Sequence, residues 1–300
     1  MSNYHTPVML NECIEGLNII PEGKYVDVTF GGGGHSNKIF EKLEGGKLIA
    51  FDKDDDVSSN KIDNEKFIFI RQDFSYLKNF LRYLDVLPVN GILADLGVSS
   101  HQIDTPKKGF SYRFNAELDM RMDSDATLTA KKILNEYPEE QLHKLFGIYG
   151  EVKNAKTLAH EIILFRKEIK FETTQDLVKV IEKCIKKNDK FNKYASQVFQ
   201  ALRIEVNDEL GSLRKMLNQS VDVLATGGRL VVLTYHSLED RLVKNFIKAG
   251  NFKGEIVKDI YGNSESYFKQ INSKPIVPTD EEIRENPRSR SAKLRIAEKI

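Results

Sequence analysis

A run of four glycines, Gly31 to Gly34, constrains the possible folds of this chain more than any other feature. It follows a strand-length run, KYVDVTF at 24–30, and precedes a helical pattern, KIFEKL at 38–43. Glycines at such a turn permit positive φ and let a ligand approach the backbone, with helix N–H groups facing it. Asp52 ends the next apolar run 21 residues after Gly31, where nucleotide-binding folds place a ribose-binding carboxylate. The alternative is a tight turn that only packs helix on strand.

The first hundred residues alternate between apolar runs and helical patterns. Further strand-length runs occupy 45–54, 66–74 and 89–100, and helical patterns occupy 11–17 and 76–84. This alternation is typical of βαβ units on a parallel sheet. Right-handed crossovers bring the ends of parallel strands to one edge, so we expect the loops after these strands to meet there.

The alternation stops after Ser100. Residues 126–225 have helical periodicity, and no clear strand follows until GGRLVVLTY at 227–235. A parallel crossover needs only about a dozen residues, so we interpret the long intervening segment as an all-helical insertion into an α/β domain. The alternating run at the end of 286–300 predicts a last, edge strand.

The expected organisation is a discontinuous α/β domain, residues 1–106 with 207–300, and an inserted helical subdomain, residues 107–206. The first segment carries 10 Lys and Arg against 16 Asp and Glu, a net charge of −6. The insertion has a net charge of +4 and the last segment +3. An acidic part for a cofactor and basic parts for a polyanion would fit this distribution, although scatter would produce similar differences.

The residues around the glycines favour S-adenosylmethionine (SAM) over a dinucleotide. Ser36 stands where the Gly-x-Gly-x-x-Gly fingerprint has its third glycine. Asp27, four positions before the glycines, is typical of SAM enzymes and could hold the ammonium group of the ligand. Phe74, in the Gln-Asp-Phe sequence that ends the third strand, offers an aromatic face to an adenine ring. An NAD-dependent oxidoreductase is the alternative.

A polar loop follows the fourth strand. It begins at Asp95 and continues through the segment 99–102, Ser-Ser-His-Gln. In this fold class that loop meets the methyl group and its acceptor, and Asp95 is the candidate catalytic residue, as a proton acceptor. His236, directly after the strand at 227–235, is a weaker second candidate, and a purely structural turn is the alternative.

Several classes of protein and site are not expected. Cys13 and Cys184 are too far apart for a CxxC site, and no HExxH motif is present, so we expect neither a disulfide framework nor a metal. No apolar run approaches the roughly 20 residues of a membrane span, and the N-terminus lacks signal-peptide character, which predicts a cytoplasmic protein. Two basic segments, 179–203 and 284–299, could hold phosphates or be ordinary solvated faces.

Taken together, the motifs closely resemble the ribosomal RNA small-subunit methyltransferase H family over about residues 5–298. The matching segments are HTPVMLNE, DVTFGGGGHS, LIAFDKD, DLGVSS, GFSYR, LDMRMD, VFQALRIEVNDEL, HSLEDR and NPRSRSAKLR. The chain departs from the family pattern at His101, where proline is usual, and at Gln197, where arginine is common.

The resemblance implies a Rossmann-like SAM-dependent methyltransferase that methylates the N4 amino group of a cytidine in the decoding centre of 16S rRNA. The partner would be 16S rRNA within the small ribosomal subunit. The resemblance also implies a set of residues that contact SAM: Gly33, Gly34, His35, Asp52, Phe74, Asp95 and Gln102. Another nucleic-acid acceptor, or a non-catalytic role in ribosome assembly, remains the alternative.

Overall fold

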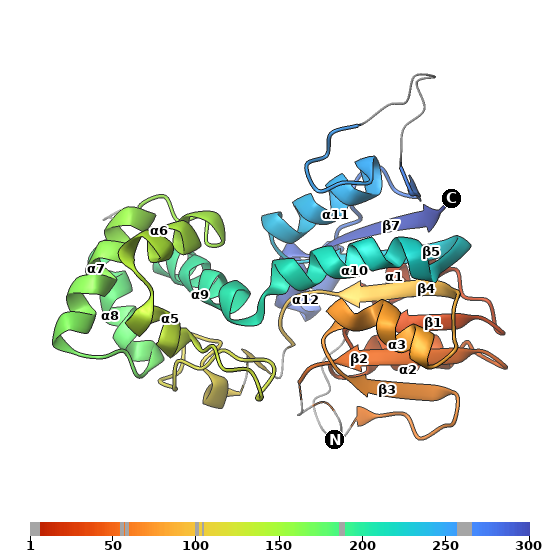
Figure 1. Ribbon diagram of the computed structural model, residues 1–300, viewed down its shortest axis with the longest axis horizontal. Helices are drawn as coiled ribbons and strands as arrows, with labels where there is room; N and C mark the ends of the chain where they lie inside the picture. The colour runs from red at the N-terminus through yellow and green to blue at the C-terminus, as the bar shows by residue number, and fades with distance from the viewer. Residues whose placement is uncertain are drawn as a thin grey trace. The chain divides into compact units, whose positions relative to one another are not determined.

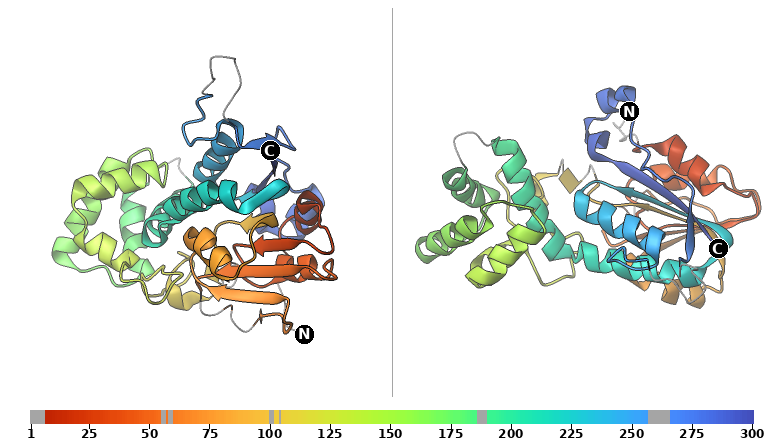
Figure 2. Two further views of the ribbon diagram at one scale, coloured as in Figure 1. Left: turned by 45° about the vertical axis from the view of Figure 1, so that its right-hand side comes forward. Right: turned by 90° about the horizontal axis from the view of Figure 1, so that it is seen from above.

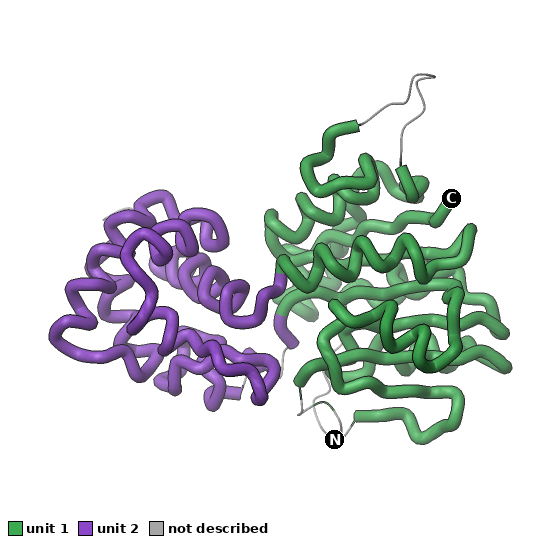
Figure 3. Tube along the Cα trace, in the orientation of Figure 1, with its two compact units in different colours: residues 1–97, 210–300 green, residues 98–209 purple. Residues whose placement is uncertain are grey.

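The computed structural model describes residues 7–54, 57, 60–99, 102–103, 105–185, 190–256 and 266–300. The chain divides into two compact units (Figure 3). The first combines residues 1–97 with 210–300, and the second contains residues 98–209.

The first unit contains a seven-stranded sheet in the order β3-β2-β1-β4-β5-β7-β6 (Figure 1). The strands are β1 Lys24–Asp27, β2 Lys47–Asp52, β3 Phe67–Arg71, β4 Val89–Asp95, β5 Leu224–Thr234, β6 Phe268–Gln270 and β7 Lys293–Lys299. β1 to β5 pair in parallel, whereas β7 is antiparallel to β5 and β6. The predicted α/β class is therefore confirmed.

One strand prediction is wrong in its placement. The C-terminal run does form β7, but β7 lies between β5 and β6 and is not an edge strand. The edge is the three-residue β6, which is too short to leave a recognisable alternation in the sequence.

Helices cover both faces of the sheet (Figure 2). They are α1 Leu10–Leu17, α2 Gly34–Phe40, α3 Leu77–Tyr83, α10 Glu209–Val223, α11 Ser237–Ala249 and α12 Asp280–Glu285, with short 3-10 turns η2 Phe74–Tyr76 and η4 Pro287–Ser291. α1, α2 and α12 lie on one face, and α3, α10 and α11 lie on the other. Apolar side chains of α1 and α2 pack with the inner strands in one buried cluster.

The strand order positions the site. β1 pairs in parallel with β2 on one side and with β4 on the other, so the order of the strands reverses between β1 and β4. Ligands of open α/β sheets bind outside the carboxyl ends of the strands at such a reversal. Asp27, Asp52 and Asp95 end these three strands.

The second unit has a helical core. Its helices are α5 Ala130–Glu136, α6 Glu139–Ile148, α7 Ala155–Glu168, α8 Thr174–Cys184 and α9 Phe191–Asn207, with the 3-10 turn η3 Pro106–Lys108. Their apolar faces share one buried cluster that includes Phe146, Phe171 and Leu202. The described part of this unit forms helices and no strand beyond an isolated bridge, in line with the predicted helical insertion. No helix in the described parts of the chain is long and apolar enough to cross a membrane.

Candidate active site

Asp27 organises the glycine loop after β1. Its carboxylate accepts hydrogen bonds from the Thr29 N–H (3.0 Å) and the Ser36 hydroxyl (2.7 Å), and only 1% of the residue is exposed. Burial raises the pKa of Asp27, and these hydrogen bonds oppose the rise. Its oxygens are buried and already accept hydrogen bonds that fix the loop, so the expectation that Asp27 holds a ligand ammonium stays a prediction.

The glycines serve different purposes. Gly33 precedes α2 with φ of 78°, in the left-handed region that glycine tolerates best. A Cβ on Gly34 would lie 2.2 Å from Cγ of Pro7, so the N-terminal segment requires glycine there. Apart from its two chain neighbours, no atom of the described residues would lie within 4 Å of a Cβ on Gly32. The open space in which a ligand could approach the backbone therefore lies at Gly32.

Asp52 sits at the end of β2 and is tied to this loop. Its carboxylate accepts hydrogen bonds from the Gly31 N–H (2.8 Å) and the Asp54 N–H (2.9 Å). Burial raises the pKa of Asp52 to about 6 despite these two donors, and the nearby Asp54 and Asp27 carboxylates add to the rise. Hydroxyl groups that donate hydrogen bonds to the Asp52 carboxylate would stabilise its ionised form. Asp52 is therefore suited to bind the hydroxyls of a ligand.

The end of β3 places Phe74 beside a charged pair. Asp73 accepts from the Ser75 N–H (2.8 Å) to begin η2, and its other oxygen lies 3.2 Å from Nζ of Lys53. Burial raises the pKa of Asp73, but Lys53 and the Ser75 donors outweigh it and lower the pKa below its ordinary value. Phe74 opens η2 with its ring half-buried.

Asp95, at the end of β4, is held from two sides. Its Oδ1 accepts a hydrogen bond from the Tyr235 hydroxyl (2.7 Å), and its Oδ2 lies 3.7 Å from Nδ1 of His35. The His35 side chain, 7% exposed, places its Nε2 3.1 Å from the Val8 carbonyl. Because a carbonyl only accepts, Nε2 carries the hydrogen and Nδ1 faces Asp95.

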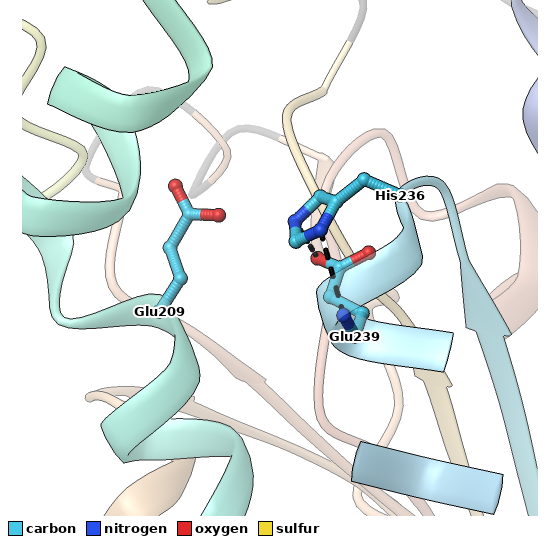
Figure 4. A group of neighbouring side chains, drawn as sticks. All are labelled: Glu209, His236 and Glu239. Carbon is cyan, nitrogen blue, oxygen red and sulfur yellow. Dashed lines mark hydrogen bonds and ion pairs between the residues drawn. The ribbon is translucent and has the colours of Figure 1, made fainter. Parts of the chain in front are cut away.

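Tyr235 is a site residue that the sequence analysis missed. It directly follows β5, and its N–H donates to the Glu239 carboxylate (2.9 Å) at the start of α11. His236 caps this helix: its Nδ1 accepts from the Glu239 N–H (3.4 Å) and its Nε2 lies 3.2 Å from Glu239 Oε1 (Figure 4). Both ring nitrogens of His236 therefore face Glu239 at the start of α11. The only sequence signal for Tyr235 was its place directly after a strand.

Gln102 belongs to the second unit. The Ser99 N–H donates to its Oε1 (3.1 Å), its own N–H donates to the Ser99 hydroxyl (3.2 Å), and its side chain is buried. Ser100 and His101, part of the same predicted polar loop, lie outside the described residues. At the other departure from the family pattern, the Gln197 amide donates to the Glu151 carbonyl (3.3 Å).

The two basic segments differ. In the helical unit Lys190 and Lys193 are exposed, whereas Lys186 and Lys187 lie outside the described residues. In the C-terminal segment the cations that follow η4 are used internally. Lys293 and Arg295 both contact the Asp240 carboxylate (3.4 and 2.7 Å), and Lys299 lies over the Tyr267 ring. Part of the positive charge of the C-terminal segment therefore stabilises the fold instead of facing a phosphate.

Comparisons with known proteins agree on one family. The MraW methylase family matches residues 2–300. A protein of Parabacteroides distasonis named ribosomal RNA small subunit methyltransferase H is 54% identical, over 100% of this chain and 98% of its own. A protein of the same name from Cytophaga hutchinsonii is 53% identical, over 99% of each chain. A solved rRNA methylase from Streptococcus thermophilus is a remote likeness: 11% identity, a TM-score of 0.41, and coverage of 97% of this chain and 93% of its own.

Proposed function

Because this chain belongs to the MraW methylase family, we propose that it transfers a methyl group from SAM to the N4 amino group of a cytidine in the decoding centre of 16S rRNA. The full-length relatives named ribosomal RNA small subunit methyltransferase H support this reaction over the NAD-dependent alternative. The observation that carries the proposal is the group of acidic strand ends, Asp52 and Asp95, beside an open glycine loop at the reversal of strand order.

The residues present suit SAM. The backbone at Gly32 borders open space, and Asp52 offers acceptors to ribose hydroxyls. Phe74 offers a ring face for adenine. We assign the cofactor contacts to the residues that match the family motifs: Gly33, Gly34, His35, Asp52, Phe74, Asp95 and Gln102. Among these, Gly34 and His35 also hold the N-terminal segment through Pro7 and Val8.

SAM, when bound, supplies an electrophilic methyl group on a sulfonium. The protein must then orient a poor nucleophile, because the lone pair of a cytosine amino group is delocalised into the ring. Holding the amino group in a near-attack geometry contributes several kcal/mol, up to about 7–11 in ideal cases. The target base has to be unpaired or flipped to enter such a site. Asp95 is the group we assign to accept the released N4 proton.

The unit of residues 98–209 is the proposed rRNA-recognition part, acting on the small ribosomal subunit in the cytoplasm. Its exposed Lys190 and Lys193 are free of the internal ion pairs that use Lys293 and Arg295 in the C-terminal segment. Charge reversal at Lys190 and Lys193, together with Lys186 and Lys187, should weaken binding to small subunits and reduce its salt dependence. Unchanged affinity at physiological salt would remove this segment from that role.

The deciding experiment is methyl transfer from radiolabelled SAM to small subunits purified from a strain that lacks the gene, followed by nucleoside analysis. Label in N4-methylcytidine is the expected result. Label in another nucleoside would show that the acceptor is not the N4 amino group of a cytidine. SAM binding without any transfer would favour a role in assembly.

A further inference from the structure

The Asp95 carboxylate is positioned by side chains from two other elements. The Tyr235 hydroxyl donates to Oδ1 at 2.7 Å, and Nδ1 of His35 approaches Oδ2 at 3.7 Å. The Asp95 N–H is also held, by the Thr29 hydroxyl oxygen at 2.6 Å. The side chain nevertheless keeps 24% of its surface exposed, so it can still meet a substrate.

The surroundings of Asp95 oppose its ionisation. Burial raises its pKa, and the Asp27 carboxylate from β1 and the Glu239 carboxylate from α11 add to the rise. His35 from α2 and the Tyr235 hydroxyl lower it. Among the groups that lower the pKa of Asp95, Tyr235 acts through a neutral hydroxyl donor.

We propose that Tyr235 is a positioning residue for methyl transfer: its hydroxyl orients the Asp95 carboxylate so that an oxygen of Asp95 can take the proton released from the amino group. This inference rests on the proposed function. In the step, the amino nitrogen bonds to the methyl carbon and the carbon–sulfur bond breaks, with its electron pair going to sulfur. One N4 proton passes to an Asp95 oxygen, so atoms and charge balance.

The tertiary structure holds Tyr235 beside Asp95. The residue follows β5 immediately, next to the strand that ends at Asp95, and its N–H is anchored on Glu239. Its ring packs near Gly97, where a Cβ would lie 3.4 Å from the tyrosine Cδ2. The ring also packs against the buried cluster of the sheet, so Tyr235→Phe should leave it in place.

The test is the pH dependence of the single-turnover rate of Tyr235→Phe with saturating SAM and unmethylated small subunits. A donor to a charged acceptor is worth enough to move the Asp95 pKa by about one unit. We expect the acidic limb of the profile to move up by about one pH unit, so that at a given pH on that limb the rate falls about tenfold. Because Asp95 is also assigned as a contact to SAM, the SAM dissociation constant is measured separately; the shift of the acidic limb is expected at saturating SAM, where a change in that constant does not affect the rate.

Two further variants separate this role from simple stability. Tyr25→Phe removes another buried hydroxyl of the same sheet, which bonds the Ile20 N–H, and should leave the pH profile unmoved. In an Asp95→Asn background, Tyr235→Phe should change the rate less than twofold, because its target is already gone.

A lower rate with an unshifted acidic limb would overturn the positioning role, and so would a full effect in the Asp95→Asn background. A rise in the SAM dissociation constant with an unchanged rate would show that Tyr235 serves cofactor binding instead. If the wild type itself placed no label in N4-methylcytidine, the proposed function would fail, and this inference with it.

Discussion

Asp52 makes SAM binding dependent on pH in a predictable direction. Its pKa is raised to about 6 by burial and by neighbouring carboxylates. Ribose hydroxyls would donate to its ionised form, so binding should favour the deprotonated state. We therefore expect affinity for SAM to be constant above about pH 7 and to fall as the pH drops through 6.

The magnitude follows from a single titration. With a pKa of about 6 in the free protein, the ionised fraction at pH 5 is about one-tenth. The SAM dissociation constant should then be about tenfold higher at pH 5 than at pH 7, or about 1.4 kcal/mol. The folded pKa lies above the unfolded value, so Asp52 costs the free protein stability as the pH rises from about 4 to 6. This cost reaches about 3 kcal/mol in order of magnitude.

The change of the SAM dissociation constant between pH 5 and pH 7 can be measured by calorimetry on the full chain. Asp52→Asn should bind SAM more weakly and lose most of the pH dependence in this range. Asp95→Asn is the second variant, because the pKa of Asp95 is also raised and it ends β4 on the other side of β1; a pH dependence that persists in Asp52→Asn and is lost in Asp95→Asn would assign the titration to Asp95. Wild-type affinity that does not change between pH 5 and pH 7, or an unchanged slope in Asp52→Asn, would refute the assignment.

Three further substitutions test the framework. Asp240→Asn leaves the buried guanidinium of Arg295, 8% exposed, without its charged partner, and should lower the free energy of unfolding by about 3 kcal/mol in urea titrations; a loss below about 1 kcal/mol would contradict the pairing. Gly34→Ala should displace Pro7 and weaken SAM binding, and adding Pro7→Gly should restore part of the affinity measured by the same calorimetry. Asn207→Ala removes hydrogen bonds to the backbone of Met120 and Met122 and should cost about 2 kcal/mol in thermal or urea unfolding, whereas an unchanged midpoint would show that these bonds add nothing.

The sequence alone determined the features that depend on short stretches of chain. Alternating runs predicted the parallel strands and the helical insertion, because the periods of strands and helices are local properties. The glycine run and the acid 21 residues beyond it predicted a nucleoside site, because the turn chemistry lies within one βαβ unit. The order of long motifs then indicated the family, which the comparisons confirm.

Only the tertiary structure decided which distant side chains meet. Tyr235 and Asp95 are 140 residues apart, and their hydrogen bond exists because β4 and β5 pair in parallel and end together. Asp27 carries the same carboxylate as Asp52, yet packing buries it with Ser36. Local periodicity does not predict such partners, because they are determined by the order of the strands and by close packing between segments that are distant in the sequence.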